Sequence, residues 1–175
     1  TNPILIDGAK GIIAGHGRLM AAKALGMTEV PVIELSGLTA AEKRAYILAD
    51  TDGTPDGGAP DVILIGTGSE VNVAMAARDQ LAAQGVRARV VSMPSWELFD
   101  RQDAAYREAV LPAAVAARVS VEAGVTLGWE RYVGPQGAMV GIDRFGESGK
   151  GPQVMAHFGI TPEHVAQKAL AVLGK

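Results

Sequence analysis

Residues Gly15 to Arg18, with the sequence GHGR, form the first group in the chain that could do chemistry. Two glycines before a helical pattern leave backbone N–H groups free, and Arg18 adds a guanidinium in the first turn of that helix. Such a turn can hold a phosphate group. The alternative is a tight strand-to-helix turn with a solvated arginine. Gly15, His16, Gly17 and Arg18 are therefore candidate phosphate contacts.

A second glycine-rich turn, GTGSE at residues 66–70, connects an apolar run to a helical pattern. It lacks both the G-x-G-x-x-G spacing of dinucleotide-binding turns and the lysine of a P-loop. The backbone N–H groups at Gly68 and Ser69 could still bind an anion at the helix N-terminus. Glu70 already places a negative charge there, which favours the alternative of a purely structural turn.

Three further ionisable residues, Glu122, His157 and His164, are candidates for catalysis or metal binding. Glu122 follows a predicted strand, where it could act as a base or pair with Arg118 or Arg131. His157 and His164 do not have the spacing of metal ligands, and we expect them at the surface or at helix ends. No metal site is therefore predicted, and an ion pair is the alternative to a catalytic role for Glu122.

Two aromatic side chains, Trp129 and Tyr132, lie in a glycine-rich loop between two predicted strands. Aromatic residues in such loops often mark a protein–protein interface, and core packing is the alternative. Exposure of these two side chains would favour self-association of the chain.

The composition excludes several classes of protein. The chain has 175 residues, no cysteine and a formal net charge of −3. The lack of cysteine excludes disulfide bonds, thiolate metal sites and a cysteine nucleophile. The small net charge provides no global attraction to nucleic acid or to an anionic membrane. No apolar run approaches the ~20 residues of a membrane span, and no signal peptide is recognisable, so we expect a cytoplasmic location.

The elements that would position GHGR are short strands and helices. Two short strands around a glycine-containing turn suggest a β-hairpin, and Pro31 favours the edge or start of the strand in which it lies. Thr39 and Glu42 have the spacing of a capping box, which predicts the start of a helix. The predicted elements are strands at residues 3–7, 11–14 and 30–35, and helices at about 19–25 and 40–48.

The first fifty residues resemble a known family. The stretch from DGAKGIIAGHGR to AYILAD resembles the ParB/sulfiredoxin-like nuclease family over nearly all of residues 4–50. In that family the glycine-rich turn with its arginine binds nucleotide phosphate, so the resemblance assigns this role to Gly15, His16, Gly17 and Arg18. The first strand of the family and the helix-turn-helix region that follows its domain are both missing. The resemblance therefore implies a fragment.

The remaining residues predict alternating strands and helices. The run at 61–65 is continuously apolar, as in a strand buried on both faces of a parallel sheet. Asp100 and Thr161 are typical helix N-caps, Pro162 is typical of the first helical position, and Gly85 is typical of a helix end. The predicted strands are at 61–65, 86–92, 118–123 and 138–142, and the predicted helices at about 70–84, 100–110, 152–158 and 162–173.

This second part resembles the carboxy-terminal domain of transketolase. The resemblance rests on PDVILIGTGSEV, RVVSMPSWELFDRQDAAYREAVLP, VEAG and FGESG, and it covers residues from about 45 to the end. It implies a three-layer α/β/α domain with a mostly parallel, five-strand mixed sheet. It also implies that thiamine diphosphate and its magnesium ion are bound by other domains, so that this chain itself holds no cofactor. The expected partners are those missing domains or a second copy of the chain.

Residues 43–60 connect the two parts. The segment Tyr46–Ala49 fits two structures, a continuation of the helix that begins near Thr39 or an antiparallel edge strand of the second domain; we predict the helix. The sequence therefore predicts a fragment at 1–50, a linker at 51–60 and a domain at 61–175. The expected function is that of a transketolase-type C-terminal domain, a structural and interaction domain without activity of its own. The alternative is a ParB-like nucleotide-binding or nuclease module carried by the GHGR turn.

Overall fold

The computed structural model describes residues 4–7, 12–14, 26–30, 32–35, 51–52 and 59–175. The chain divides into two compact units, Thr1–Ala49 and Asp50–Lys175. Each unit contains its own β-sheet.

The first unit contains a three-stranded sheet in the order β2-β1-β3. Its strands are β1 (Ile4–Asp7), β2 (Ile12–Ala14) and β3 (Val32–Leu35). The antiparallel pairing of β1 with β2 confirms the predicted hairpin, and β3 lies at the sheet edge, as Pro31 predicts. The predicted helices at 19–25 and 40–48, the GHGR turn and the segment Tyr46–Ala49 lie outside the described residues.

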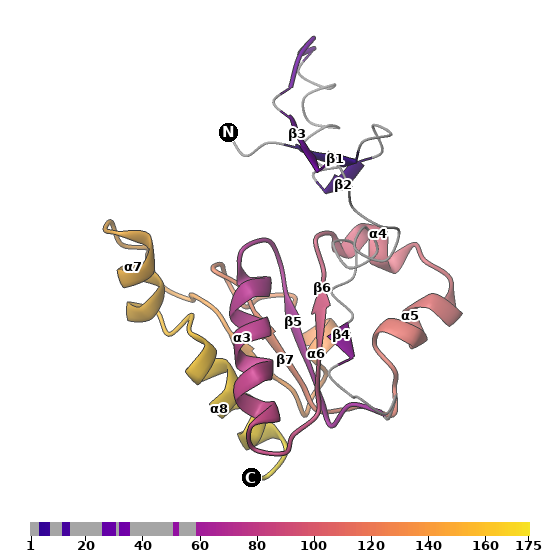
Figure 1. Ribbon diagram of the computed structural model, residues 1–175, viewed down its shortest axis with the longest axis vertical. Helices are drawn as coiled ribbons and strands as arrows, with labels where there is room; N and C mark the ends of the chain where they lie inside the picture. The colour runs from indigo at the N-terminus through magenta and orange to yellow at the C-terminus, as the bar shows by residue number, and fades with distance from the viewer. Residues whose placement is uncertain (1–3, 8–11, 15–25, 31, 36–50, 53–58) are drawn as a thin grey trace. The chain divides into compact units, whose positions relative to one another are not determined.

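The second unit alternates strands and helices along the chain (Figure 1). Its strands are β4 (Thr51–Asp52), β5 (Val62–Gly66), β6 (Ala88–Ser92), β7 (Arg118–Val121) and β8 (Ala138–Val140). Its helices are α3 (Glu70–Ala82), α4 (Trp96–Asp100), α5 (Ala104–Val110), α6 (Glu130–Val133), α7 (Gly151–His157) and α8 (Pro162–Val172).

The sheet of this unit confirms the predicted fold class. Its order is β4-β6-β5-β7-β8, with four parallel strands and one antiparallel edge strand, β4. This edge strand lies at Thr51–Asp52, inside the segment predicted as a linker, and it pairs with β6. A strand of two residues is too short to show an alternating pattern, so the turn-forming residues that follow it determined the prediction.

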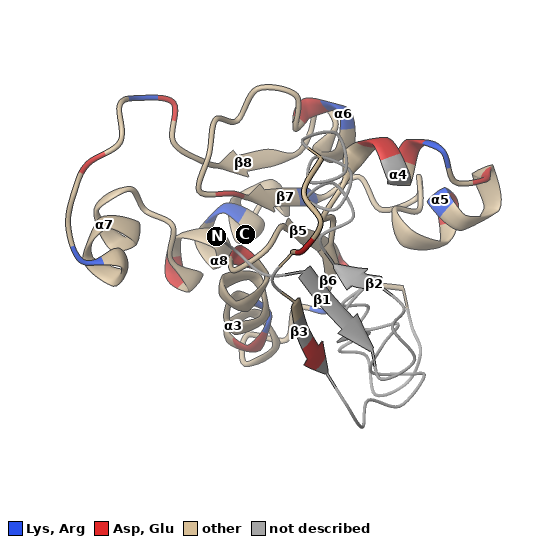
Figure 2. Cartoon of the chain, turned by 90° about the horizontal axis from the view of Figure 1, so that it is seen from above, with Lys and Arg blue, Asp and Glu red and all other residues tan. Residues whose placement is uncertain are grey.

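The apolar run of β5 explains its central position. All five residues of β5 are buried, as expected for a strand with a layer of helices on each face of the sheet. Helices α3 and α8 pack side by side on one face, and α4, α5 and α6 lie on the other (Figures 1 and 2). The two layers bury both faces of the sheet, so the core of this unit lies along β5, β6 and β7.

Two helical segments differ from the sequence prediction. The single helix predicted at 100–110 is two helices, α4 and α5, and the N-cap of α5 is Asp103, whose carboxylate accepts a hydrogen bond of 2.7 Å from the backbone N–H of Tyr106. Asp100, predicted as the N-cap, is instead the last residue of α4, and its carboxylate accepts hydrogen bonds from Arg131 and Tyr132. The loop predicted after β7 contains the short helix α6. The predicted N-cap of α8 is confirmed: Thr161 accepts from the backbone N–H of His164.

Candidate functional site

One pocket lies at the carboxyl ends of the parallel strands. Thr67 follows β5, Met93 follows β6 and Glu122 follows β7, so the three residues meet at one edge of the sheet. This is where ligands bind in open α/β sheets. The pocket has a volume of about 410 Å³. We call it the strand-end pocket, and its other lining residues are Pro94, Ser95, Trp96, Glu97, Gly124, Val125, Leu127 and Trp129.

Glu122 is the half-buried acid of the strand-end pocket. Its carboxylate accepts a hydrogen bond from the hydroxyl of Thr67. Burial raises the pKa of Glu122, the hydrogen bond from Thr67 lowers it, and the nearby charge of Glu70 raises it further, for a net upward shift. The predicted pairing with Arg118 or Arg131 is wrong, because Arg118 donates to backbone carbonyls and Arg131 to Asp100. The arrangement leaves a carboxyl group that holds its proton more tightly than an exposed one.

The raised pKa of Glu122 makes a prediction about pH. Below the ordinary pKa of 4.5, Glu122 is protonated in both the folded and the unfolded protein, so its burial costs no stability through charge. As the pH rises through the raised pKa of the folded state, the buried carboxylate becomes charged and the folded protein loses stability. The neutral variant Glu122→Gln should therefore gain melting temperature relative to the wild type, and the gain should increase from pH 4.5 to pH 7.5. Thermal unfolding across this range measures it.

Glu97→Gln is the matched control for that experiment. Glu97 lines the same pocket but is exposed, and hydrogen bonds from its own backbone N–H and from Ser95 lower its pKa. Its carboxylate contributes stability above its ordinary pKa, and this contribution is lost as the pH falls. Glu97→Gln should therefore lose stability at neutral pH and converge on the wild type in acid. A pH-independent effect of Glu122→Gln would contradict the burial of its charge.

The GTGSE turn presents a carboxylate as well as backbone donors. Gly68 has a positive φ of 50°, which favours glycine. The backbone N–H of Glu70 donates to the carbonyl of Thr67 at 3.0 Å, and Ser69 donates its hydroxyl to the carboxylate of Glu70 at 2.9 Å. Glu70 is only 6% exposed, so its side chain is packed at the start of α3. Anion binding at Gly68 and Ser69 stays a prediction.

The aromatic residues of this region form a buried cluster. The rings of Trp96 and Trp129 meet edge to face with centroids 5.0 Å apart, and the ring of Tyr132 lies 6.0 Å from Trp129. Trp129 and Tyr132 are 3% and 4% exposed. Core packing is therefore the correct alternative for these two residues, and they give no support to self-association through an exposed aromatic surface.

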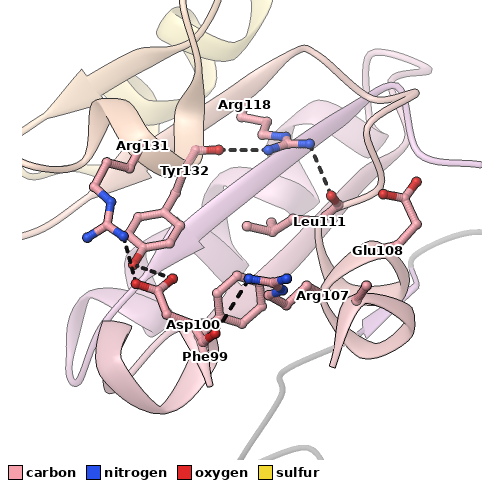
Figure 3. Close-up of a pocket in the computed structure, with 9 residues that line it drawn as sticks. Phe99, Asp100, Arg107, Glu108, Leu111, Arg118, Arg131 and Tyr132 are labelled. Carbon is pink, nitrogen blue, oxygen red and sulfur yellow. Dashed lines mark hydrogen bonds and ion pairs between the residues drawn. The ribbon is translucent and has the colours of Figure 1, made fainter. Parts of the chain in front are cut away.

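A second pocket, of about 390 Å³, opens between α4, α5, α6 and the start of β7 (Figure 3). We call it the arginine pocket, because three arginines line it. Its lining residues are Phe99, Asp100, Ala104, Arg107, Glu108, Leu111, Arg118, Arg131 and Tyr132.

Arg118 connects the walls of the arginine pocket. Its guanidinium donates to the backbone carbonyls of Val115 at 2.9 Å, Tyr132 at 2.8 Å, Leu111 at 3.1 Å and Pro112 at 2.9 Å. These carbonyls belong to the end of α5, the following turn and α6. Burial lowers the pKa of Arg118, and the charge of Glu108 opposes that shift. One side chain at the start of β7 thus fixes the positions of two helices.

Asp100 is the acceptor on the opposite wall. Arg131 donates to one of its carboxylate oxygens at 2.7 Å, and the hydroxyl of Tyr132 donates to the other at 3.2 Å. Burial and the charge of Asp100 raise the pKa of Tyr132 to about 12, so the hydroxyl stays protonated at neutral pH. No sequence motif indicates this group, because Asp100 lies on α4 and its two partners lie on α6, about thirty positions away.

The histidines occupy the positions expected for them. His157, in the last turn of α7, interacts through Nε2 with Glu147 at 3.0 Å and with Arg144 at 2.8 Å. His164 interacts through Nδ1 with the carbonyl of Gly159 at 2.9 Å. Among the described residues, no group of three or more His, Cys, Asp or Glu side chains could hold a metal ion.

The second unit matches a known protein family. The family described as transketolase-like TK C-terminal domain matches residues 45–161. This range includes strands β4 to β8, both pockets and the aromatic cluster.

Curated relatives and a solved structure agree with that match. The chain is 43% identical to a transketolase of Geobacillus stearothermophilus over 157 residues, which are 88% of this chain and 23% of that protein. It is 43% identical to a transketolase of Nostoc sp. over 170 residues, 96% of this chain and 25% of that protein. A transketolase structure from Leishmania mexicana aligns with a TM-score of 0.67 and 33% identity, covering 99% of this chain and 25% of that one.

The coverage values define what is shared. The chain spans about a quarter of the length of these relatives. The alignments that cover 96% and 99% of the chain include residues before position 45, where the family match begins. The relatives thus match more of this chain than the C-terminal domain alone, and the matched part belongs to a larger protein in each of them.

Proposed function

The chain belongs to the transketolase family, because residues 45–161 match its C-terminal domain, and we propose that it serves as a structural and interaction domain of a thiamine-diphosphate-dependent ketol transferase, without catalytic activity of its own. The observation that carries the proposal is the coverage: the aligned part of this chain corresponds to about a quarter of each relative. Thiamine diphosphate and magnesium would be bound by the other domains of such an enzyme. The expected partners are those domains or a second copy of this chain, and the expected location is the cytoplasm.

Two carboxylates of the second unit accept hydrogen bonds from its own side chains. The half-buried acid Glu122 is bonded to Thr67, and Asp100 is bonded to Arg131 and Tyr132. Each carboxylate thus already has a donor within the domain, as expected where the side chains stabilise loops and helices. None of the helices in the described ranges is long and apolar enough to cross a membrane.

A ketol-transfer assay tests the proposal. The chain alone, supplied with thiamine diphosphate and magnesium, should give no turnover above a protein-free blank. Mixed with the remaining domains of the Geobacillus stearothermophilus transketolase, it should form a complex detectable by size-exclusion chromatography with light scattering. Turnover by the chain alone would contradict the non-catalytic role, and elution of both components as separate species would contradict the interaction role.

A second function is proposed for the first unit. Residues 1–49 form a compact unit with their own three-stranded sheet, ahead of most of the family match. We propose that this unit corresponds to the ParB-like fragment at 1–50 and that Gly15, His16, Gly17 and Arg18 bind a nucleotide phosphate. Calorimetry with CTP and ATP on the wild type and Arg18→Ala tests this function. Binding heat in the wild type alone supports it, and no heat in either protein overturns it.

A further inference from the structure

The arginine pocket contains more positive than negative charge. Arg107, Arg118 and Arg131 line it together with two acids, Asp100 and Glu108, which leaves one positive charge in excess. Both acids are already engaged. Asp100 accepts from Arg131 and Tyr132, and Glu108 accepts from the backbone N–H of Ala113 at 3.0 Å. Figure 2 shows that basic and acidic residues are interspersed along α4, α5 and α6, so neither sign of charge dominates these helices. The excess of positive charge is therefore confined to the pocket.

Arg118 is the partly buried cation of the pocket, and it interacts electrostatically with Glu108. Its four hydrogen bonds all go to backbone carbonyls, which satisfy its N–H groups but carry no net charge. The side chain is partly buried, where a charge is screened less by water than at the surface. A guanidinium held in this way attracts an anion more strongly than an exposed one does.

Arg107 lies at the mouth of the same pocket (Figure 3). Among the described residues its side chain donates to the carbonyl of Asp100 at 3.4 Å, which is long for a charge-assisted hydrogen bond. The residue is exposed and lies in the last turn of α5. Its guanidinium can therefore turn toward a ligand without breaking a strong contact.

The rest of the wall is apolar or aromatic. The ring centroids of Phe99 and Tyr132 lie 5.9 Å apart, and Leu111 lines the same pocket. Guanidinium groups recognise carboxylate and phosphate oxygens through paired N–H donors. Aromatic and aliphatic walls accommodate the carbon part of a ligand, and a volume of about 390 Å³ is within the usual range for small-molecule sites.

We propose that the arginine pocket binds a small organic oxyanion, a carboxylate or a phosphate monoester attached to an apolar ring or chain. The oxyanion lies between Arg107 and Arg118, and the apolar part lies against Phe99, Leu111 and Tyr132. This binding is independent of the ketol-transfer function and of the GHGR turn.

Titrations of the full chain with four probes test the proposal. Phenyl phosphate and benzoate carry the two oxyanions on a ring, phenol lacks the charge, and inorganic phosphate lacks the ring. We expect saturable binding of phenyl phosphate or benzoate with a Kd on the order of 1 mM, as for other fragment-sized ligands, and binding at least about 10-fold weaker for phenol and inorganic phosphate. The preferred ring compound identifies the oxyanion. No saturable binding of either ring compound up to about 10 mM overturns the proposal.

Two arginine variants locate the binding. Arg107→Gln should weaken binding of the preferred probe about 10-fold, as expected for loss of a charge-assisted contact, and should leave the unfolding midpoint unchanged. Arg101→Gln is the matched control, because Arg101 is exposed and directly follows α4 but does not line the pocket. It should change the affinity less than about 2-fold. Equal losses in both variants, or no loss in Arg107→Gln, overturn the assignment to this pocket. In NMR spectra of the wild type, the amide signals of Leu111 and Tyr132 should shift on addition of the probe, and unchanged signals there also overturn it.

Discussion

Replacement of Leu64 by alanine should lower the free energy of unfolding by about 3–5 kcal/mol. Leu64 is 0% exposed and lies at the centre of β5, where its backbone is paired with Val90 of β6 and Val119 of β7. Both faces of this strand are covered, so the surrounding residues cannot collapse fully into the cavity that the truncation leaves. Urea unfolding followed by tryptophan fluorescence measures the loss, since Trp129 is buried in the native state.

Leu127→Ala is the control for this experiment. Leu127 is 76% exposed, so the same truncation removes few contacts and should cost less than about 0.5 kcal/mol. If Leu64→Ala does not fold, Leu64→Val should still show a loss of about 1 kcal/mol, as expected for removal of one buried methylene. Similar losses for Leu64→Ala and Leu127→Ala would contradict the position of β5 at the centre of the core.

Replacement of Arg118 by methionine should cost about 2–4 kcal/mol. The substitution keeps a long apolar side chain but removes the donors to four backbone carbonyls, from Leu111, Pro112, Val115 and Tyr132. Unpaired buried acceptors carry a desolvation cost, although water reaches this partly exposed site and reduces the total. Arg118→Lys restores the charge but not the planar fork of donors, so it should recover only part of the loss.

Arg131→Met provides the comparison within the same pocket. Arg131 is exposed, and its ion pair with Asp100 is of the surface type, worth no more than about 1 kcal/mol. Urea unfolding of both methionine variants therefore separates the two roles. An Arg118→Met loss no greater than that of Arg131→Met would show that the four carbonyl contacts do not hold α5 and α6 in place.

The core of the second unit could be predicted from the sequence because its signals are local. The apolar run of β5, the Thr161–Pro162 start of α8 and the turn at Gly85 each identify an element from a few neighbouring residues. The family resemblance implied a mostly parallel, five-strand mixed sheet, whereas the order of its strands was not predicted. The individual strands and helices could be predicted because they depend on hydrophobic periodicity and helix capping, which can be read directly from a sequence.

The parts that could not be predicted depend on contacts between distant residues. Asp100 resembles a helix N-cap in sequence, but Arg131 and Tyr132, about thirty positions away, hold its carboxylate at the end of α4. Glu122, at the end of β7, accepts a hydrogen bond from Thr67 at the end of the adjacent strand β5, and does not pair with Arg118 or Arg131. The arginine pocket draws its residues from α4, α5, β7 and α6, so no spacing in the sequence indicates it.

The two-residue strand β4 determines where an isolated domain can begin. Among the described residues, β4 is the strand that pairs with the outer edge of β6, at Val90 and Arg89. An uncovered strand edge exposes a row of N–H and C=O groups to which a strand of another molecule can add, and this is a common start of aggregation. A truncated chain that begins at residue 61, the start of the domain predicted from sequence, would lack β4 and leave β6 open along this edge. A chain that begins near residue 45, where the family match begins, keeps the edge covered.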